Sequence, residues 1–327
     1  MEFSILIIDR NTTYNISKSV TSMTLESFIE GQAGKCTLTC DKTQINANMG
    51  SMIEVKVGNI GMFKGYLFNE SFSNGFETEL TFYDQLRYWK YSDAISMSGL
   101  KLHEVFYKLC KIMGLNYKAY NTTRYVLPAK IWSNATYFKI WEDYQDLNFI
   151  STNGYHIIRD EFGVLALHEV QYLFNNTVKK YIISDTSLAK DYEFSRGIGS
   201  DTYNIVKIVN ENSETKKRET HTAQDNNTIK QWGRLQYFEK SSEELNSAQL
   251  KKRAEDLLKV KSRVFNSLDV ELIGNADTLN LRVGDGVIMG ISDLTYVNLY
   301  GKALVIEKIA HKFNGGRYTV DLTLMLS

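Results

Sequence analysis

The sequence has very little proline and cysteine. The first shortage limits which residues can form the turns, and the second limits disulfides and cysteine-bound metal sites. Pro128 is the only proline among 327 residues, so glycine, asparagine, aspartate and serine have to form nearly all the turns. Cys36 and Cys40 lie four residues apart in a strand-like segment. That spacing spans about 13 Å, too far for a disulfide or a shared metal ion. Cys110 falls at an apolar position of a helical pattern. We therefore expect three small buried thiols, as in a chain kept in a reducing compartment.

The chain also lacks an excess of either charge and any long apolar run. Lysine plus arginine number 38 and aspartate plus glutamate number 38, so the formal net charge is +0. A neutral chain has no overall field to attract DNA or an anionic membrane. No apolar run approaches the roughly 20 residues of a membrane-spanning helix. Residues 1–9 lack a basic region, which predicts a first strand rather than a signal peptide. We expect no membrane insertion and synthesis in a cytoplasm.

Motifs for catalysis and cofactor binding are absent as well. The sequence contains no Gly-x-Ser-x-Gly, His-Glu-x-x-His, phosphate-binding P-loop or Cys-x-x-Cys. His156 and His168 face each other across a predicted hairpin, but two histidines rarely make a metal site, so a solvated cross-strand pair is expected. Carboxylate clusters around Asp143 and Asp160 are of the kind that glycosidases use. They fall on a polar helix face and in a hairpin turn, where burial would not raise a pKa. We expect no catalytic residue, metal site, cofactor or small-molecule substrate.

The sequence does contain strand patterns, and they occupy the first and last parts of the chain. Residues 1–91 contain six or so short apolar-alternating segments, with a hairpin turn signal at Ser73-Asn74-Gly75. Residues 191–327 return to this pattern around one helix, which the capping box Ser241–Glu244 begins. A closing hairpin is predicted around Asn314-Gly315-Gly316. Short strands at this spacing are typical of a β-barrel or a β-sandwich.

The middle of the chain changes to a helical period. One apolar face predicts a first amphipathic helix, which Gly114 ends, and it consists of Leu102, Val105, Phe106, Leu109, Cys110 and Met113. A second helix is expected over 134–148 and a hairpin over 156–168. The fold class predicted from these patterns is mainly β with an α+β insertion. The expected domains are a first β-domain over 1–91, the insertion over 92–190 and a second β-domain with one helix over 191–327.

The stretch Glu79–Tyr91 stands between the first β-rich region and the insertion. It begins as a strand and then gathers four aromatic residues beside charged ones: Phe82, Tyr83, Tyr88 and Trp89 around Asp84, Arg87 and Lys90. Such aromatics suit a sealed joint between two domains. An ordinary core strand followed by a loop fits the same residues equally well, so both interpretations stay open.

Several segments together resemble one family of phage tail proteins over nearly the whole chain. The segments that carry the resemblance are Phe82–Lys90, Asp201–Lys207, Glu211–Thr220, Lys230–Glu239, Ala248–Leu258 and His311–Leu324. They are similar to the corresponding parts of the PBSX-like tail protein family, the baseplate hub proteins of contractile phage tails and R-type bacteriocins. These motifs are structural and mark no active site.

The resemblance implies a fold, an assembly and partners. It implies two tail-tube-like β-barrel domains that flank the small α+β domain. A homotrimer of such chains is a structural baseplate hub of a contractile injection system, an adaptor between the sixfold tail tube and the threefold central spike. Tube protein, spike protein and other baseplate proteins would bind it, and DNA would only pass through the lumen. The hub would be assembled in the bacterial cytoplasm and belong to a virion or a bacteriocin particle.

Exposed aromatic residues of the signature segments are the candidate interface residues, because aromatics concentrate binding energy in interfaces. They are Trp89, Trp232, Tyr237 and Phe238, and the competing interpretation makes them core residues of their own domains. A tail-associated cell-wall hydrolase, which would cleave peptidoglycan, is the alternative function. It draws on a hydrolase label carried by some family members and on Asp143 and Asp160. A receptor-binding adhesin would need a repetitive or sugar-binding tip, and none is visible.

Overall fold

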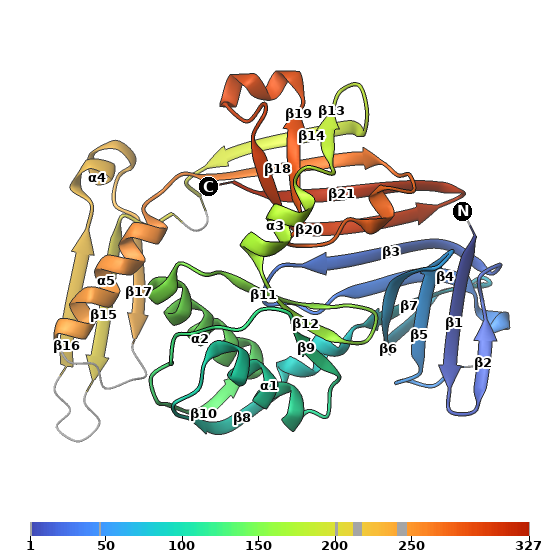
Figure 1. Cartoon of the computed structure of the whole chain (residues 1–327), viewed down its shortest axis with the longest axis horizontal. Helices are drawn as coiled ribbons and strands as arrows, with labels where there is room; N and C mark the ends of the chain where they lie inside the picture. The colour runs from blue at the N-terminus through green and yellow to red at the C-terminus, as the bar shows by residue number, and fades with distance from the viewer. Residues whose placement is uncertain (1, 46, 200–201, 212–217, 241–246, 327) are drawn as a thin grey trace. The chain divides into compact units, whose positions relative to one another are not determined.

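The chain forms two compact units, each rich in strands (Figure 1). One unit is Met1–Glu193 with Leu268–Ser327, and the other is Phe194–Ser267. The residues described in this computed structural model are 2–45, 47–199, 202–211, 218–240 and 247–326. The predicted class, mainly β with helices in the insertion, is confirmed. The sequence also predicts a turn at Asn212-Ser213. That turn and the capping box Ser241–Glu244 lie outside the described residues.

The larger unit contains most of the strands and three α-helices among its described residues. In its N-terminal part the elements are β1 (Phe3–Asp9), β2 (Thr12–Asn15), β3 (Val20–Phe28), β4 (Lys35–Asp41), β5 (Met52–Val57), β6 (Ile60–Phe72), β7 (Glu77–Tyr83) and β8 (Ser92–Met97). The insertion adds α1 (Leu102–Ile112), β9 (Tyr117–Ala119), β10 (Lys130–Thr136), α2 (Tyr137–Thr152), β11 (His156–Asp160), β12 (Leu165–Glu169), α3 (Val170–Thr177), β13 (Ile182–Ser184) and β14 (Ala189–Gly197). The C-terminal strands are β18 (Phe265–Ile273), β19 (Gly286–Gly290), β20 (Ala303–Asn314) and β21 (Arg317–Met325).

One large sheet joins the N-terminal and C-terminal strands of this unit. Its order is β14-β18-β21-β20-β3-β4-β7-β6-β5-β1-β2, and β19 attaches β13 to β20 at the side. The two ends of the chain meet where β3 pairs antiparallel with β20, for example at Leu25 and His311. Figure 1 shows these two strands side by side in the middle of the unit. The predicted closing hairpin is the pair β20–β21, joined at Asn314 and Arg317.

Two hydrophobic cores stabilise the larger unit. The first lies among the strands β1 to β7 and includes the fully buried Ile7, Leu38 and Phe82. The second lies in the insertion, where the predicted apolar face of α1 packs against α2 through residues such as Phe106 and Ile140. Burying a large apolar side chain stabilises the folded state by roughly 1.5–3 kcal/mol. Each core therefore stabilises the part of the unit in which it lies.

The smaller unit is an α/β module with its own core. It contains β15 (Ile205–Glu211), β16 (Arg218–Gln224), α4 (Asn226–Trp232), β17 (Gln236–Lys240) and α5 (Ser247–Lys261). The strands pair in the order β16-β15-β17. Leu250 and Ala254 on α5 pack against Val206, Ile208 and Ala223. These apolar residues therefore form the buried face of α5.

The units divide the chain differently from the three expected domains. Residues 194–267, expected to be part of a second β-domain over 191–327, form a unit of their own, whereas 268–327 share the large sheet with the strands of 1–91. The physical reason is the β3–β20 ladder. It joins segments that are far apart in the sequence, and local alternation carries no information about such a partner.

Candidate interaction surfaces

The aromatic stretch after β7 is a sealed joint within the larger unit. Asp84 caps the 3₁₀ helix Gln85–Lys90 by accepting a hydrogen bond from the backbone N–H of Leu86 at 2.9 Å. Its other carboxylate oxygen accepts the N–H of Gly34 at 2.8 Å. The helix then carries Leu86 and Trp89 into the core of the insertion. The packing therefore supports the interpretation of this stretch as a sealed joint between two parts of the unit, rather than as an ordinary core strand followed by a loop.

Trp89 is a core residue, which corrects the expectation that it is exposed. Its side chain is 0% exposed, and its ring centre lies 6.2 Å from that of Trp141 and 6.3 Å from that of Phe106. A side chain with no accessible surface in its own chain cannot contact another subunit without local unfolding. The alternative considered for these aromatics, a place in the core, applies to Trp89.

The other three candidate aromatics lie in the smaller unit. Trp232 ends α4 and is half-buried. Tyr237 is half-buried on β17, with its ring 5.4 Å from that of Tyr203 and 5.0 Å from the Lys261 ammonium. Phe238 points to the opposite face of the strand and is 57% exposed. Of the four candidates, Phe238 therefore offers the most surface to a partner.

The two candidate carboxylates occupy different environments. Asp143 accepts hydrogen bonds from Lys130 at 2.9 Å and from the Trp132 indole at 3.1 Å. Burial opposes its ionisation, but hydrogen bonds from Lys130, Trp132 and Lys139 and the charge of Lys130 together hold the pKa of Asp143 below its usual value. Asp160 accepts a bond from the Gln85 amide at 3.1 Å. Burial raises the pKa of Asp160, so the expectation that burial raises neither pKa is wrong for this residue.

The two histidines of the hairpin do not form the expected solvated pair. Both are buried. Because His168 is opposite Ile157 and His156 is opposite Glu169, the histidines point to opposite faces of the β11–β12 ladder. His168 stacks on Tyr120, with ring centres 4.4 Å apart, and its Nε2 lies 2.8 Å from a carboxylate oxygen of Glu161. They are packing residues of the insertion.

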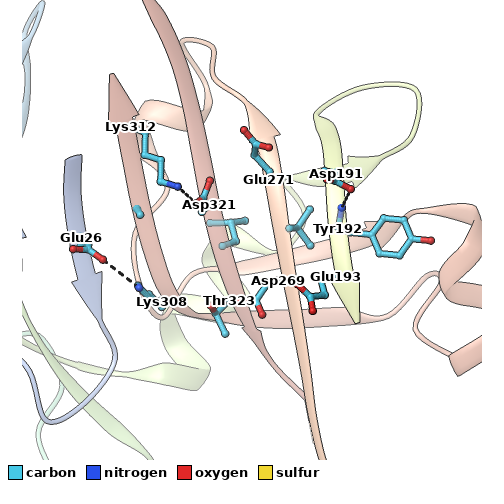
Figure 2. Close-up of a pocket in the computed structure, with 13 residues that line it drawn as sticks. Glu26, Asp191, Tyr192, Glu193, Asp269, Glu271, Lys308, Lys312, Asp321 and Thr323 are labelled. Atoms are coloured by element: carbon cyan, nitrogen blue, oxygen red, sulfur yellow. Dashed lines mark hydrogen bonds and ion pairs between the residues drawn. The ribbon is translucent and has the colours of Figure 1, made fainter. Parts of the chain in front are cut away.

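A concave, acid-rich face of the large sheet is a surface that the sequence patterns did not reveal. It spans β14, β18, β21, β20 and β3 and encloses a hollow of about 670 Å³. Figure 2 shows the residues that line it on these strands. We define the acidic face by its six carboxylates, which are Glu26, Asp191, Glu193, Asp269, Glu271 and Asp321.

The acidic face has more negative than positive side chains. Two lysines line it, and both are ion-paired: Lys308 with Glu26 at 3.2 Å, and Lys312 with Asp321. Two neighbouring lysines pair with carboxylates of the face as well: Lys35 with Glu26 and Lys190 with Glu271, each at 2.6 Å. Asp191 and Glu193 on the outermost strand β14 are exposed, and neither has an ion-pair partner among the described residues. A sequence signal existed, since acidic residues alternate at 191/193 and 269/271. The strand order that brings these pairs together was not predictable from it.

Within the described ranges, no three His, Cys, Asp or Glu side chains are grouped so that they could hold a metal ion. Among the same residues, no helix has both the length and the apolar character needed to cross a membrane.

Comparison with known proteins gives a curated relative and several similar structures. The chain is 25% identical to the protein YqbQ of Bacillus subtilis (strain 168) over 268 residues, 81% of this chain and 77% of that protein. The 43 kDa tail protein of prophage MuSo2 from Shewanella oneidensis superimposes with a TM-score of 0.70 and 12% identity, covering 98% of each chain.

A second similar structure comes from a secretion system. The E. coli c3393 protein has a TM-score of 0.57 and 7% identity over 100% of this chain and 77% of its own. It is described as a component of the type VI secretion system, structurally similar to the T4 bacteriophage tail proteins gp27 and gp5. The chain thus has the fold of tail proteins, as the resemblance of its signature segments implied. A profile of the YqbQ-like family matches residues 23–325, and the chain belongs to this family.

Proposed function

We propose that the chain is a structural subunit of a tail baseplate hub. Three copies would form an adaptor between the sixfold tail tube and the threefold central spike of a contractile phage tail or an R-type bacteriocin. The observation that carries this proposal is the fold likeness to a prophage tail protein, which extends over 98% of both chains. A likeness of that extent involves both units and is not limited to one common barrel.

The arrangement of strands supports an assembly role. Among the described residues, β2 pairs only with β1 at one end of the large sheet, and β14 pairs only with β18 at the other. Unpaired strand edges favour association with other chains. A closed ring of identical subunits can cover such edges because symmetry repeats the same contact around the axis. In the proposed particle the neighbours would be tube, spike and other baseplate proteins, and DNA would only pass through the lumen.

Phe238 is the first residue that we propose for such an interface, followed by the half-buried Tyr237 and Trp232. An exposed aromatic ring on a strand provides a large apolar contact at low entropic cost. Trp89 has no part in this proposal because it is buried in its own chain.

The alternative, a peptidoglycan hydrolase, gains no support from its candidate residues. Asp143 is fixed by Lys130 and Lys139, and its lowered pKa suits an ion pair rather than a general acid. Asp160 has the raised pKa that a general acid needs. Its oxygens, however, accept bonds from Gln85 and the Gly163 backbone in a buried joint.

The experiment that tests the proposal is native mass spectrometry of the purified chain, alone and mixed with the tube and spike proteins encoded with it. A trimer, formed alone or with the spike, is the expected result. A monomer that binds neither protein would exclude the hub. Peptidoglycan clearing by the same preparation, lost in Asp160→Asn, would then establish the hydrolase instead.

A further inference from the structure

The tip of the β11–β12 hairpin holds an aromatic residue in the left-handed backbone conformation. Phe162 has a φ of 54°, and it is the only aromatic among the described non-glycine residues with positive φ. For a side chain of this size the conformation is unfavourable, because the Cβ atom crowds the following carbonyl oxygen. Such strain persists only where surrounding contacts hold it, and it is concentrated in clamps and switch segments.

Strands β5 and β6 provide a seat for the Phe162 ring. A Cβ atom added to Gly61 would lie 2.7 Å from two atoms of this ring, so the ring rests directly on the bare backbone of β6. The ammonium groups of Lys56 and Lys64 lie 5.1 Å and 5.9 Å from the ring centre, within the range of a cation–π interaction. We call residues 161–164 the latch and define its seat as Gly61, Lys56 and Lys64.

The base of the same hairpin is held by apolar packing instead. Ile157 is 1% exposed and belongs to a core cluster with Val170 and Leu173. The N–H of Val170 also donates to the carbonyl of Tyr155 at 2.9 Å. Phe162, by contrast, is only half-buried. The latch can therefore leave its seat without exposing this core cluster.

Polar contacts within the hairpin fix the shape of the latch. The carboxylate of Glu161 accepts the Nε–H of Arg159 at 2.9 Å and lies 2.8 Å from the Nε2 of His168. The N–H of Glu161 donates to the carbonyl of Val164 at 2.8 Å. All three contacts join residues of the hairpin itself. They maintain the turn that strains Phe162, but they do not tie it to the seat.

The closed latch carries a second unfavourable feature at Asp160, the residue before it. Asp160 lies close enough to Asp84 for its charge to raise the pKa of Asp84. The charge of Lys64 and the side-chain amide of Gln85, which donates at 3.1 Å, act in the opposite direction on Asp160. A strained backbone and two like charges are therefore concentrated at one contact. Local features that oppose the fold in this way are expected at sites that change conformation.

We propose that the latch opens and closes on its seat as a two-state conformational device while the rest of the larger unit stays folded. In the closed state the Phe162 ring covers Gly61. In the open state the backbone at Phe162 relaxes, Asp160 reaches solvent, and the part of β6 around Gly61 is uncovered. The device belongs to the larger unit alone and does not depend on the chain being a hub subunit. In a hub, it would make the attachment of the insertion to the large sheet adjustable.

Amide hydrogen exchange of the full chain, resolved residue by residue by NMR, tests the proposal. The bonded amide of Glu161 reports the latch, since relaxation at Phe162 breaks the turn, and the bonded amide of Val170 reports the base of the hairpin. Gly61→Ala places a methyl group where the ring rests and leaves the hairpin sequence unchanged. We expect it to accelerate exchange at Glu161 about tenfold and at Val170 less than twofold. Equal acceleration at the two amides, or none at Glu161, would overturn the proposal.

Two further variants separate backbone strain from the loss of the ring. Phe162→Ala and Phe162→Gly both remove the ring, but only glycine adopts a positive φ without strain. The glycine variant should therefore exchange about threefold more slowly at Glu161 than the alanine variant. Equal rates would show that the backbone at Phe162 stores no strain, and a latch driven by strain would then be excluded.

The matched control for Gly61→Ala is Gly197→Ala, where the nearest atom to the added Cβ would be 3.9 Å away. The control should leave exchange at Glu161 unchanged. An acceleration as large as that of Gly61→Ala would show that the effect does not come from the seat, and it would overturn the proposal.

Discussion

The carboxyl groups of Asp84 and Asp160 interact at the joint between the large sheet and the insertion. Asp84 caps the 3₁₀ helix whose first residue, Gln85, donates its side-chain amide to Asp160 at 3.1 Å. Burial, and then the charge of Asp160, raises the pKa of Asp84 well above its ordinary value. Burial likewise raises the pKa of Asp160. The folded chain therefore binds protons at this joint more tightly than the unfolded chain.

This interaction predicts a pH dependence of stability. A carboxyl whose folded-state pKa is raised stabilises the fold most at low pH, and that contribution is lost as the pH rises from 3.8 through the raised value. Asp160→Asn removes one of the two charges. Relative to the unchanged protein, the variant should be more stable at pH 7.5 than at pH 4.5, with a free energy of unfolding larger by about 1 kcal/mol. Urea unfolding at the two pH values measures the difference.

Asp143→Asn is the control for the sign of this effect. The pKa of Asp143 is held low by Lys130 against burial, so its charged form stabilises the fold at neutral pH. That contribution is lost as the pH falls through the lowered value. Because pH 7.5 and pH 4.5 both lie above 3.8, the Asp143 variant should lose nearly the same stability at the two pH values, unlike Asp160→Asn. Parallel pH profiles for Asp160→Asn and the unchanged protein would contradict the assignment of the buried pair.

Gly34→Ala should destabilise the same joint. A Cβ atom at this position would lie 2.4 Å from a carboxylate oxygen of Asp84 and 3.4 Å from the carbonyl oxygen of Glu26. The Asp84 oxygen cannot move away without losing the bond that the Gly34 N–H donates. We expect a loss of about 2 kcal/mol in the free energy of unfolding. The control is Gly197→Ala, where the nearest atom would be 3.9 Å away. Equal effects of the two substitutions would refute the steric argument.

Trp89 and Phe238 should respond in opposite ways to truncation. Trp89→Ala empties a fully buried site and should cost about 3–5 kcal/mol of stability. Phe238→Ala removes a side chain that is 57% exposed and should change stability by less than about 0.5 kcal/mol. If Phe238 contacts a partner in the assembled particle, the same substitution should weaken assembly as followed by native mass spectrometry. Unchanged assembly would remove Phe238 from the proposed interface.

Elements that depend on local pattern could be predicted from the sequence. The apolar spacing from Leu102 to Cys110 predicted α1, and the structure buries that face. The glycine turn at Asn314-Gly315-Gly316 and the alternation after it predicted the β20–β21 hairpin. In both cases the information lies within a dozen residues, because one helix turn or one hairpin register determines which side chains are buried.

Features that depend on distant pairing could not be predicted. Asp160 ends β11 three residues before Gly163, which is the pattern of a solvated turn. It is half-buried because Gln85 and Asp84 from another part of the chain lie against it. The acidic face likewise exists only because β3 and β20 pair and place Glu26 beside Lys308. The spacing of residues in the sequence does not indicate that β3 and β20 are neighbours.

Arg282 connects the first and last parts of the larger unit. One of its guanidinium nitrogens donates to the carbonyls of Leu279 at 2.7 Å and Leu281 at 2.8 Å, and the other to the carbonyl of Gly61 on β6 at 3.3 Å. Burial, and then the nearby charge of Arg159, lowers the pKa of Arg282, while Asp285 acts in the opposite direction. The guanidinium is thus a buried cation satisfied mainly by backbone oxygens.

Both Arg282→Met and Arg282→Lys should destabilise the chain by about 3 kcal/mol. Methionine fills the space but leaves three carbonyls without this donor, and a lysine ammonium cannot reproduce the forked geometry that reaches both Leu281 and Gly61. Urea unfolding measures the loss, and the exposed Arg317→Lys on β21 is the control, with a change below about 0.5 kcal/mol. Hydrogen exchange should accelerate at β6 in both Arg282 variants, since the bonds from Arg282 to the Gly61 carbonyl and to the Met62 sulfur cross to that strand. An Arg282→Lys protein as stable as the unchanged chain would show that charge alone, without the fork, holds these segments together.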